Sequence, residues 1–266
     1  MNDNPIGVFD SGVGGLTVVK ELIKSLPYEN IVYLGDTARV PYGTKSSETI
    51  KRFSIENAAF LKKFKVKLII VACNTASSVA LPILRKRFSV PVIGVIGPGA
   101  MKAVATTRNN RIGVIGTPAT IKSNAYEKEI KRFSSGKKVF SVACPLFVPI
   151  AEEGSLSSRI TIDVVSMYLK PLMKKNIDTL VLGCTHYPLL RNAITKVVGK
   201  NVRIIDSAVS VAEEVAVMLE GRDVLRISLK KPDYRFFATD TVEQFVKTGE
   251  KFLKRKIKRI RRVNYV

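Results

Sequence analysis

The 266-residue sequence contains no tryptophan, one histidine and three cysteines. Disulfide frameworks and zinc modules need several cysteines or histidines at short, regular spacings, so these counts argue against both kinds of protein and against a metal site. A chain of this length buries roughly three quarters of the surface that its unfolded form exposes, so its core needs neither disulfide bonds nor a structural metal. We expect one or two globular domains in a reducing compartment.

Long apolar stretches are also absent, and the N-terminus lacks the basic and apolar segments of an export signal. Both absences predict a cytoplasmic protein without a membrane partner. Acidic residues are few, since 22 Asp and Glu stand against 44 Lys and Arg and leave a net charge of +22. An excess of this size is typical of proteins that bind nucleic acid or anionic membranes.

Much of this charge lies near the C-terminus. Residues 247–262 contain nine Lys or Arg and one Glu, with Phe252, Leu253, Ile257 and Ile260 at roughly helical spacing. The segment is either a basic amphipathic arm for a polyanion or a solvated face that packs its apolar side on the domain. We favour packing, so nucleic-acid binding through this segment is a possibility that we do not favour.

Short β-branched apolar runs alternate with amphipathic stretches along the chain. Near-continuous apolar strands are typical of a parallel sheet covered on both faces, so the pattern predicts the α/β class. Helical spacing is clear in residues 16–26, where an apolar face ends before Pro27. The predicted strands are residues 6–9, 31–34, 68–72, 92–96, 112–115, 179–182 and 202–205.

An internal repeat relates the two halves of the sequence. IGVFDSG at residues 6–12 resembles IGVIGTP at residues 112–118, and LIIVACNT at 68–75 resembles TLVLGCTH at 179–186. The two pairs occur in the same order and at similar separations. The repeat predicts two similar parallel-sheet α/β units, each with one cysteine after a buried strand.

Cys73 and Cys184 are the cysteines of this repeat. In open α/β sheets the crevice lies beyond the carboxyl ends of the strands, so both thiols are expected to face a cleft, at turns where helices begin. A cysteine base needs help from a helix start, a carboxylate or a histidine, because an ordinary thiol is mostly protonated at neutral pH. Either cysteine alone could be an ordinary core residue, but the pairing favours function.

His186, the single histidine, stands two residues after Cys184 and could exchange a proton with its thiol or bind an anionic substrate. Its alternative role is a structural one at a helix start. Polar residues flank both cysteines: Asn74 and Thr75 follow Cys73, and Thr185 follows Cys184.

The segment from Asp10 to Gly15 follows the first predicted strand. It resembles a dinucleotide-binding glycine motif, but Thr17 replaces the third glycine, which argues against that function. Either the glycines let the backbone approach a small anion beside the Asp10 carboxylate, or Asp10 or Ser11 simply caps the helix. The two alternatives are equally compatible with the spacing.

Three further sites carry weaker evidence. Residues 41–43, Pro-Tyr-Gly, predict a turn with no required chemistry. Glu152 and Glu153 end an apolar run and could belong to a solvated loop. Cys144 lacks a polar neighbourhood, which favours a structural role.

These motifs together resemble the bacterial glutamate racemases, within the cofactor-independent aspartate/glutamate racemase superfamily. The matching segments span most of the chain in the order of the family. They are IGVFDSGVGGLTV (6–18), YLGDTARVPYG (33–43), VACNTASS (71–78), CPLFVPIAEEG (144–154) and GCTHYPLL (183–190).

The resemblance implies two facing α/β domains with an active site in the cleft between them. It implies a discontinuous first domain, residues 1–96 plus 207–266, and a second domain at residues 97–206. It also implies that Cys73 and Cys184 are the paired acid and base, assisted by Asp10, Glu152 and His186. The implied substrate-binding residues are Asp10, Ser11, Tyr42, Gly43, Asn74, Thr75, Thr185 and His186.

The implied reaction is the interconversion of L- and D-glutamate without a cofactor, which supplies D-glutamate for peptidoglycan. Two opposed thiols suit it, because inversion removes a proton from one face of the α-carbon and delivers one to the other. We expect a homodimer that binds glutamate. Aspartate racemase is the alternative within the superfamily, but the FDSGVGG and GCTHYP segments favour glutamate.

Overall fold

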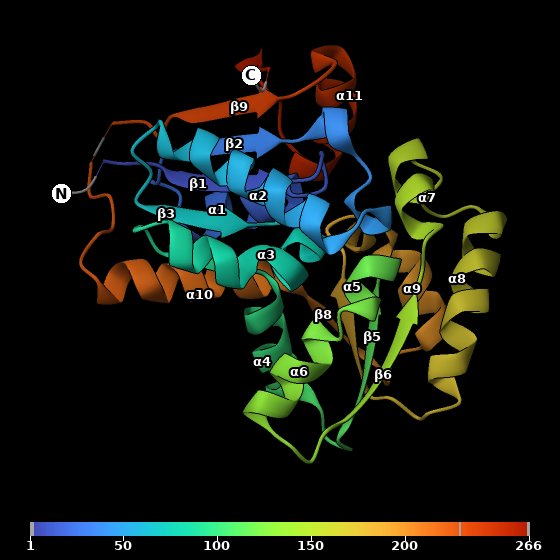
Figure 1. The fold of residues 1–266 in the computed structure, drawn as a ribbon. Coiled ribbons are helices and arrows are strands. Elements are labelled where there is room, and N and C mark those ends of the chain that lie inside the picture. The colour runs from blue at the N-terminus through green and yellow to red at the C-terminus, as the bar shows by residue number, and fades with distance from the viewer. Residues whose placement is uncertain (1–2, 229, 265–266) are drawn as a thin grey trace.

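The computed structural model describes residues 3–228 and 230–264, which form two parallel β-sheets with helices on their faces (Figure 1). Every strand pairing is parallel, which confirms the predicted α/β class with two similar sheets. We call the six-stranded sheet with its helices the first unit and the four-stranded sheet with its helices the second unit. In the described ranges, no helix is both long and apolar enough to span a membrane.

The sheet of the first unit has the order β10-β9-β2-β1-β3-β4, and that of the second has the order β6-β5-β7-β8. The first contains β1 (Ile6–Asp10), β2 (Ile31–Gly35), β3 (Leu68–Val71), β4 (Val92–Gly94), β9 (Tyr234–Ala238) and β10 (Ile260–Arg262). The second contains β5 (Arg111–Gly116), β6 (Lys138–Ala143), β7 (Thr179–Gly183) and β8 (Arg203–Asp206).

The helices cover the faces of these sheets. In the first unit they are α1 (Leu16–Ser25), α2 (Ser47–Lys62), α3 (Asn74–Arg87), α10 (Ser207–Gly221) and α11 (Val242–Leu253), with short 3-10 helices η1 (Thr37–Arg39) and η2 (Tyr42–Thr44). In the second they are α4 (Ile96–Thr106), α5 (Pro118–Lys122), α6 (Ala125–Phe133), α7 (Phe147–Glu153), α8 (Arg159–Met173), η3 (Tyr187–Leu190) and α9 (Arg191–Val198).

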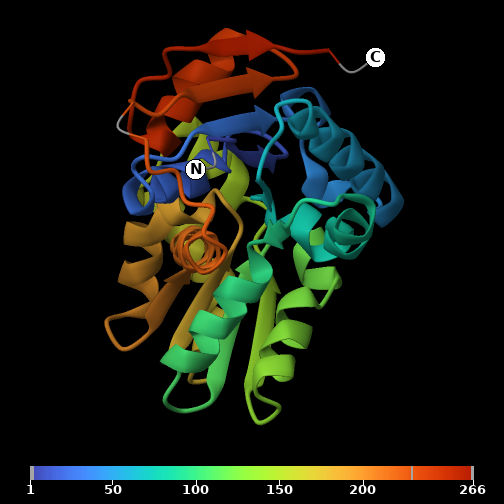
Figure 2. The same ribbon diagram turned by 90° about the vertical axis from the view of Figure 1, so that its left-hand side faces the viewer.

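The chain leaves the first sheet after β4, builds the whole second sheet, and returns to the first sheet with β9 and β10. The predicted domains, residues 1–96 plus 207–266 and residues 97–206, agree with this strand membership and otherwise stay a prediction. Figure 2 shows β9 and β10, at the red end of the colour scale, on the side of the first unit that lies away from the second.

The central strand β1 explains why the apolar runs are continuous. It pairs with β2 and β3 and is buried on both faces. Successive side chains of a strand point to opposite faces, so Ile6 and Val8 pack in one core and Phe9 packs in the other. The apolar face predicted for α1 is buried as expected, with Leu16 and Leu22 fully enclosed.

Three strands, β6, β9 and β10, were not predicted. Both β6 and β10 lie at sheet edges and are partly exposed, so they lack the continuous aliphatic character used to find strands. Strand β9 is internal, but its sequence YRFFA contains no β-branched residue and relies on aromatic ones.

The basic segment at residues 247–262 contributes the end of α11 and all of β10. Its apolar residues Phe252, Leu253 and Ile257 are buried in the core of the first unit, while most of its Lys and Arg side chains are exposed. The structure therefore shows the packing that we favoured. The absence of a nucleic-acid partner stays a prediction.

Candidate active site

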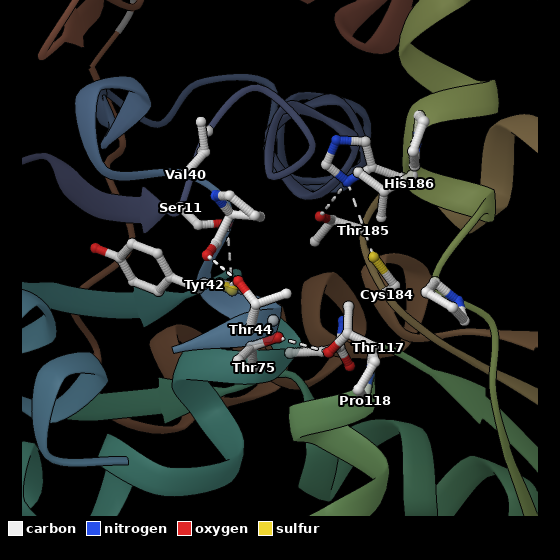
Figure 3. A pocket seen from close by; sticks show the side chains of 18 of the residues that line it. Ser11, Val40, Tyr42, Thr44, Thr75, Thr117, Pro118, Cys184, Thr185 and His186 are labelled. Carbon is white, nitrogen blue, oxygen red and sulfur yellow. Dashed lines mark hydrogen bonds between the residues drawn. The ribbon is translucent and has the colours of Figure 1, made fainter. Parts of the chain in front are cut away.

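A cavity of about 340 Å³ lies where loops from both sheets meet. Its walls come from the carboxyl ends of strands in both units, as expected for α/β sheets. Figure 3 shows Ser11, Tyr42 and Thr75 of the first unit on one side and Cys184 and His186 of the second unit on the other. The lining residues are Ser11, Gly12, Val40, Pro41, Tyr42, Gly43, Thr44, Cys73, Asn74, Thr75, Thr117, Pro118, Pro145, Val148, Pro149, Glu152, Cys184, Thr185 and His186.

All but one of the predicted site residues line this cavity. The exception is Asp10, which is fully buried behind the lining residues Ser11 and Gly12. Its Oδ2 atom accepts a hydrogen bond from the Gly12 N–H at 3.0 Å. Helix α1 has Gly15 at its N-cap, so neither Asp10 nor Ser11 is the helix cap that the sequence left open.

Several lining residues were not predicted, among them Thr44, Thr117 and Pro149. The internal repeat contained the information for one of them, because Thr117 follows β5 as Ser11 follows β1. Thr117 belongs to a hydroxyl cluster that joins the two units, since its Oγ1 lies 2.9 Å from that of Thr75.

The Cys73 thiol is buried at the start of α3, where it accepts a hydrogen bond from the Ala76 N–H at 3.5 Å. It also lies 3.5 Å from the Ser11 hydroxyl. A helix start was one of the groups expected to help ionise this thiol. Burial, and next the nearby Asp10 carboxylate, nevertheless raise its pKa from 9.0 to about 12, because burial disfavours a charged thiolate and Asp10 repels it.

Asp10 itself is held in an apolar setting. Burial raises the pKa of its carboxyl group, although His186 and the backbone N–H groups of Gly15, Gly12 and Ser11 act in the opposite direction. In the described part of the chain its Oδ1 atom has no hydrogen-bond partner. The raised pKa makes Asp10 easier to protonate than an exposed carboxyl group.

The second thiol has a different neighbourhood. Cys184 Sγ lies 3.8 Å from His186 Nδ1 (Figure 3). His186 Nε2 lies 2.9 Å from Glu152 Oε1 on α7. Burial alone would lower the pKa of His186, but the hydrogen bonds with Cys184 and Glu152 outweigh it and raise the pKa to about 10. The hydrogen bond from His186 in turn lowers the pKa of Glu152. His186 therefore lies between Cys184 and Glu152 and contacts both through its two ring nitrogens.

The turn after Cys184 differs from the turn after Cys73. The helix expected there begins as the short 3-10 helix η3, with His186 at its N-cap, and α9 begins only at Arg191. Pro188, at the start of η3, cannot donate a backbone hydrogen bond, which favours this delayed start. His186, rather than a helix start, is therefore the positive group beside Cys184.

The amide of Asn74 is a free donor in the cavity wall. Asn74 is almost fully buried, and in the described residues its Nδ2 atom has no hydrogen-bond partner. A buried donor without a partner costs free energy, so the site favours a ligand oxygen that can accept from it. Thr75 and Thr185 add hydroxyl groups on the two sides of the same cavity.

Tyr42 contributes its ring and backbone to the cavity, because its hydroxyl group is already engaged. That hydroxyl donates to Asp36 and accepts a hydrogen bond from Asn57 Nδ2 at 3.1 Å. Both partners lie in the first unit behind the η2 loop. Their hydrogen bonds fix the loop that places Gly43 and Thr44 in the wall.

The two units touch closely at Gly14. A Cβ atom there would lie 2.3 Å from Thr185 Oγ1 and 2.6 Å from the His186 ring, so only glycine fits. The Thr17 hydroxyl lies nearby, 2.9 Å from the Gly14 carbonyl and 3.3 Å from that of Thr185. The loop that resembles a dinucleotide motif is thus a contact between the units.

Cys144 lies outside the cavity, fully buried in the core of the second unit, in agreement with the structural role favoured for it. Across residues 3–228 and 230–264, no group of three His, Cys, Asp or Glu side chains is placed to hold a metal ion.

A family model described as Asp/Glu/Hydantoin racemase matches residues 6–215 of this chain. The chain is 51% identical over 248 residues to a protein of Geobacter metallireducens named glutamate racemase, covering 93% of this chain and 92% of that protein.

Solved structures show the same likeness. The glutamate racemase isoform RacE1 of Bacillus anthracis superposes with a TM-score of 0.96 at 44% identity, covering 99% of this chain and 98% of that one. The glutamate racemase of Francisella tularensis in complex with D-glutamate gives a TM-score of 0.93 at 42% identity, with the same coverage.

Proposed function

This chain belongs to the Asp/Glu/Hydantoin racemase family, and from that premise we propose that it interconverts L-glutamate and D-glutamate by proton transfer between two cysteines. One observation carries the proposal: Cys73 and Cys184, from two different sheets, line the same cavity. The matched relatives named glutamate racemase, one of them in complex with D-glutamate, support the choice of substrate.

The cavity suits a small dicarboxylate amino acid. Ser11, Thr75 and Thr185 supply hydroxyl groups, Asn74 supplies its free amide donor, and Gly43 brings backbone close to the space. Carboxylate oxygens accept from all of these groups. Among the described lining residues His186 is the one basic side chain, so binding depends mainly on neutral donors.

The reaction begins with the thiols in opposite protonation states. In the proposed starting state Cys184, which lies beside His186, acts as the base, and Cys73 is the thiol because burial and Asp10 raise its pKa. The thiolate takes the α-proton from one face of the substrate, which leaves a carbanion conjugated with the α-carboxylate. The opposite thiol then donates its proton to the other face.

At the end of one turnover Cys184 carries a proton and Cys73 is the thiolate, so the enzyme is ready for the other enantiomer. Asp10 and Glu152 assist the two thiols from opposite sides, Asp10 next to Cys73 and Glu152 through His186. The free amide of Asn74 and the neighbouring hydroxyl groups stabilise the charge that develops on the carboxylate. The proposed steps use no cofactor.

In the cell, D-glutamate made in this way would supply peptidoglycan synthesis in the cytoplasm. We expect the active form to be a homodimer, which sedimentation equilibrium would test by a mass twice that of the chain.

A fluorescence titration with duplex DNA at low and moderate salt tests whether the basic segment binds nucleic acid. We expect no saturable binding there, whereas affinity that falls steeply with salt would establish phosphate contacts.

The central experiment incubates L-glutamate with the purified protein in D₂O and follows chirality by circular dichroism and deuterium by NMR. We expect D-glutamate to appear with deuterium at the α-carbon, and the same from the D enantiomer. The parallel incubation with L- and D-aspartate should show far slower conversion. Activity on aspartate alone, or a strict need for added pyridoxal phosphate, would overturn the proposal.

A further inference from the structure

Tyr126 connects the second unit to the catalytic side of the first. It lies in α6 and is almost fully buried, and its hydroxyl donates a hydrogen bond of 2.6 Å to Asn74 Oδ1. Asn74 is the first residue of α3 and directly follows Cys73. The bond therefore joins a helix of one unit to the start of a catalytic helix in the other.

The ring of Tyr126 is held firmly where it lies. Its edge packs over two glycines, because a Cβ atom on Gly183 would lie 3.0 Å from the ring and one on Gly99 would lie 3.5 Å from it. Ile130, one turn further along α6, is buried in the same core. A packed ring has little freedom to turn, so the direction of its hydroxyl is set by the core of the second unit.

This contact sets which end of the Asn74 amide faces Tyr126. An amide can turn over and present either its oxygen or its NH₂ group. A hydroxyl that donates to Oδ1 keeps the oxygen on the Tyr126 side and turns Nδ2 away from it, and this buried donor has no partner in the described residues. The reverse orientation would point an oxygen at a substrate carboxylate and repel it.

We propose that Tyr126 is a positioning residue that orients Asn74 so that its NH₂ group donates to a substrate carboxylate. The inference rests on the proposed racemisation of glutamate and goes one step beyond it. Substrate binding by the first unit then depends on how the second unit is aligned with it. The donor lies on α3 of the first unit, and its orientation is set from α6 of the second.

A double-mutant cycle tests this role with Tyr126→Phe, Asn74→Ala and the combination, each assayed for L- and D-glutamate racemisation. We expect Tyr126→Phe to raise KM about tenfold with a smaller change in kcat, the size of one lost hydrogen bond to a charged group. In the Asn74→Ala background the same substitution should change KM by less than about twofold, because the residue it orients is gone.

The matched control is Tyr187→Phe. Tyr187 is also fully buried, and its hydroxyl donates a hydrogen bond of 2.8 Å to the Cys144 carbonyl, away from Asn74. It should lower the melting temperature about as much as Tyr126→Phe does but produce no coupling with Asn74→Ala. A Tyr126→Phe effect of equal size in both backgrounds would overturn the inference.

Asn74→Asp provides a test that leaves Tyr126 intact. With one carboxylate oxygen held by Tyr126, the other faces the substrate carboxylate, so KM should rise more than in Asn74→Ala. A KM for Asn74→Asp equal to or lower than that of Asn74→Ala would overturn the inference.

The wild type is assayed alongside these variants. If it fails to racemise glutamate, the result counts against the proposed function. If it is active but shows no coupling between Tyr126 and Asn74, the result counts against the role of Tyr126 alone.

Discussion

The two walls of the cavity hold equivalent cysteines in different surroundings. Both Cys73 and Cys184 follow a buried strand of a parallel sheet, and both are nearly inaccessible to solvent. Cys73 begins an α-helix and has Asp10 as its charged neighbour, whereas Cys184 precedes a short 3-10 helix and has His186 beside it. The repeat of the fold thus places the thiols alike, and their neighbours make them different.

This difference has a chemical consequence. A two-base reaction needs one thiolate and one thiol at the start of each turnover. An acidic neighbour beside Cys73 and a basic one beside Cys184 make the two walls unequal in how well they accommodate a negative charge. The following predictions test whether the two cysteines, each with its own neighbours, have these separate roles.

The largest effect is expected from removing either thiol. Cys73→Ala and Cys184→Ala should each lower kcat for racemisation by about 10⁴-fold, because each removes a group that transfers a proton. Circular dichroism of glutamate solutions measures the rate. Cys144→Ala is the matched control and should keep its activity, since that thiol lies in the core outside the cavity. Full activity in either of the first two variants would exclude the two-cysteine mechanism.

His186→Gln should act mainly on the wall that holds Cys184. The two enantiomers of glutamate are equally stable in water, so kcat/KM must stay equal in the two directions in any variant. An unequal loss of kcat must then be matched by an unequal change in KM. Losing the partner of Cys184 should lower kcat by about 10³-fold in the direction that starts from the Cys184 thiolate, and much less in the other. Initial rates from each pure enantiomer measure this, and equal losses of kcat would contradict the assignment.

Gly14→Ala tests the contact between the walls without altering either thiol. The new Cβ atom would displace Thr185 and the His186 ring, and a misplacement of about 1 Å costs roughly 10²-fold in rate. Gly97→Ala is the control, since no heavy atom lies within 4 Å of a Cβ atom there. Unchanged activity of Gly14→Ala, measured at equal folded fraction, would show that the walls separate more readily than the structure indicates.

The smallest effect is expected from Glu152→Gln, and it depends on pH. The raised pKa of His186 contributes stability in full below pH 6.5, and this is lost as the pH rises through about 10. The lowered pKa of Glu152 contributes stability above pH 4.5, lost as the pH falls through the lowered value. Removing the pair should cost about 1 kcal/mol, a small value because Glu152 is half exposed.

Urea unfolding of wild type and Glu152→Gln across the pH range measures this difference. It should be greatest between pH 4.5 and 6.5 and vanish above about pH 10. The alkaline limb of the pH–rate profile should also move to lower pH, because His186 has lost one of the partners that raise its pKa. A difference in stability that persists above pH 10 would assign the effect of Glu152 to packing.

Much of the site could be predicted because strand ends are visible in a sequence. Continuous apolar runs located β1, β3 and β7, and the residues after them include Ser11, Cys73 and Cys184. The family resemblance added Tyr42, Gly43 and Glu152. Strand ends and motifs gave no information where contacts join segments far apart in the sequence. No pattern of neighbouring residues indicated the role of Tyr126 or the close approach of the two units at Gly14.

The sequence by itself determined the α/β class, the positions of the two thiols and the polar residues beside them. All of these depend on neighbours along the chain, through strand periodicity and the turn that follows each strand. Only the tertiary structure decided which charged groups lie beside each thiol and how the side chains of the cavity are oriented. These depend on burial and on charges from segments far apart in sequence, such as Glu152 beside His186 and Tyr126 beside Asn74. Electrostatic and hydrogen-bonding free energies depend on distance in space, which the order of residues does not specify.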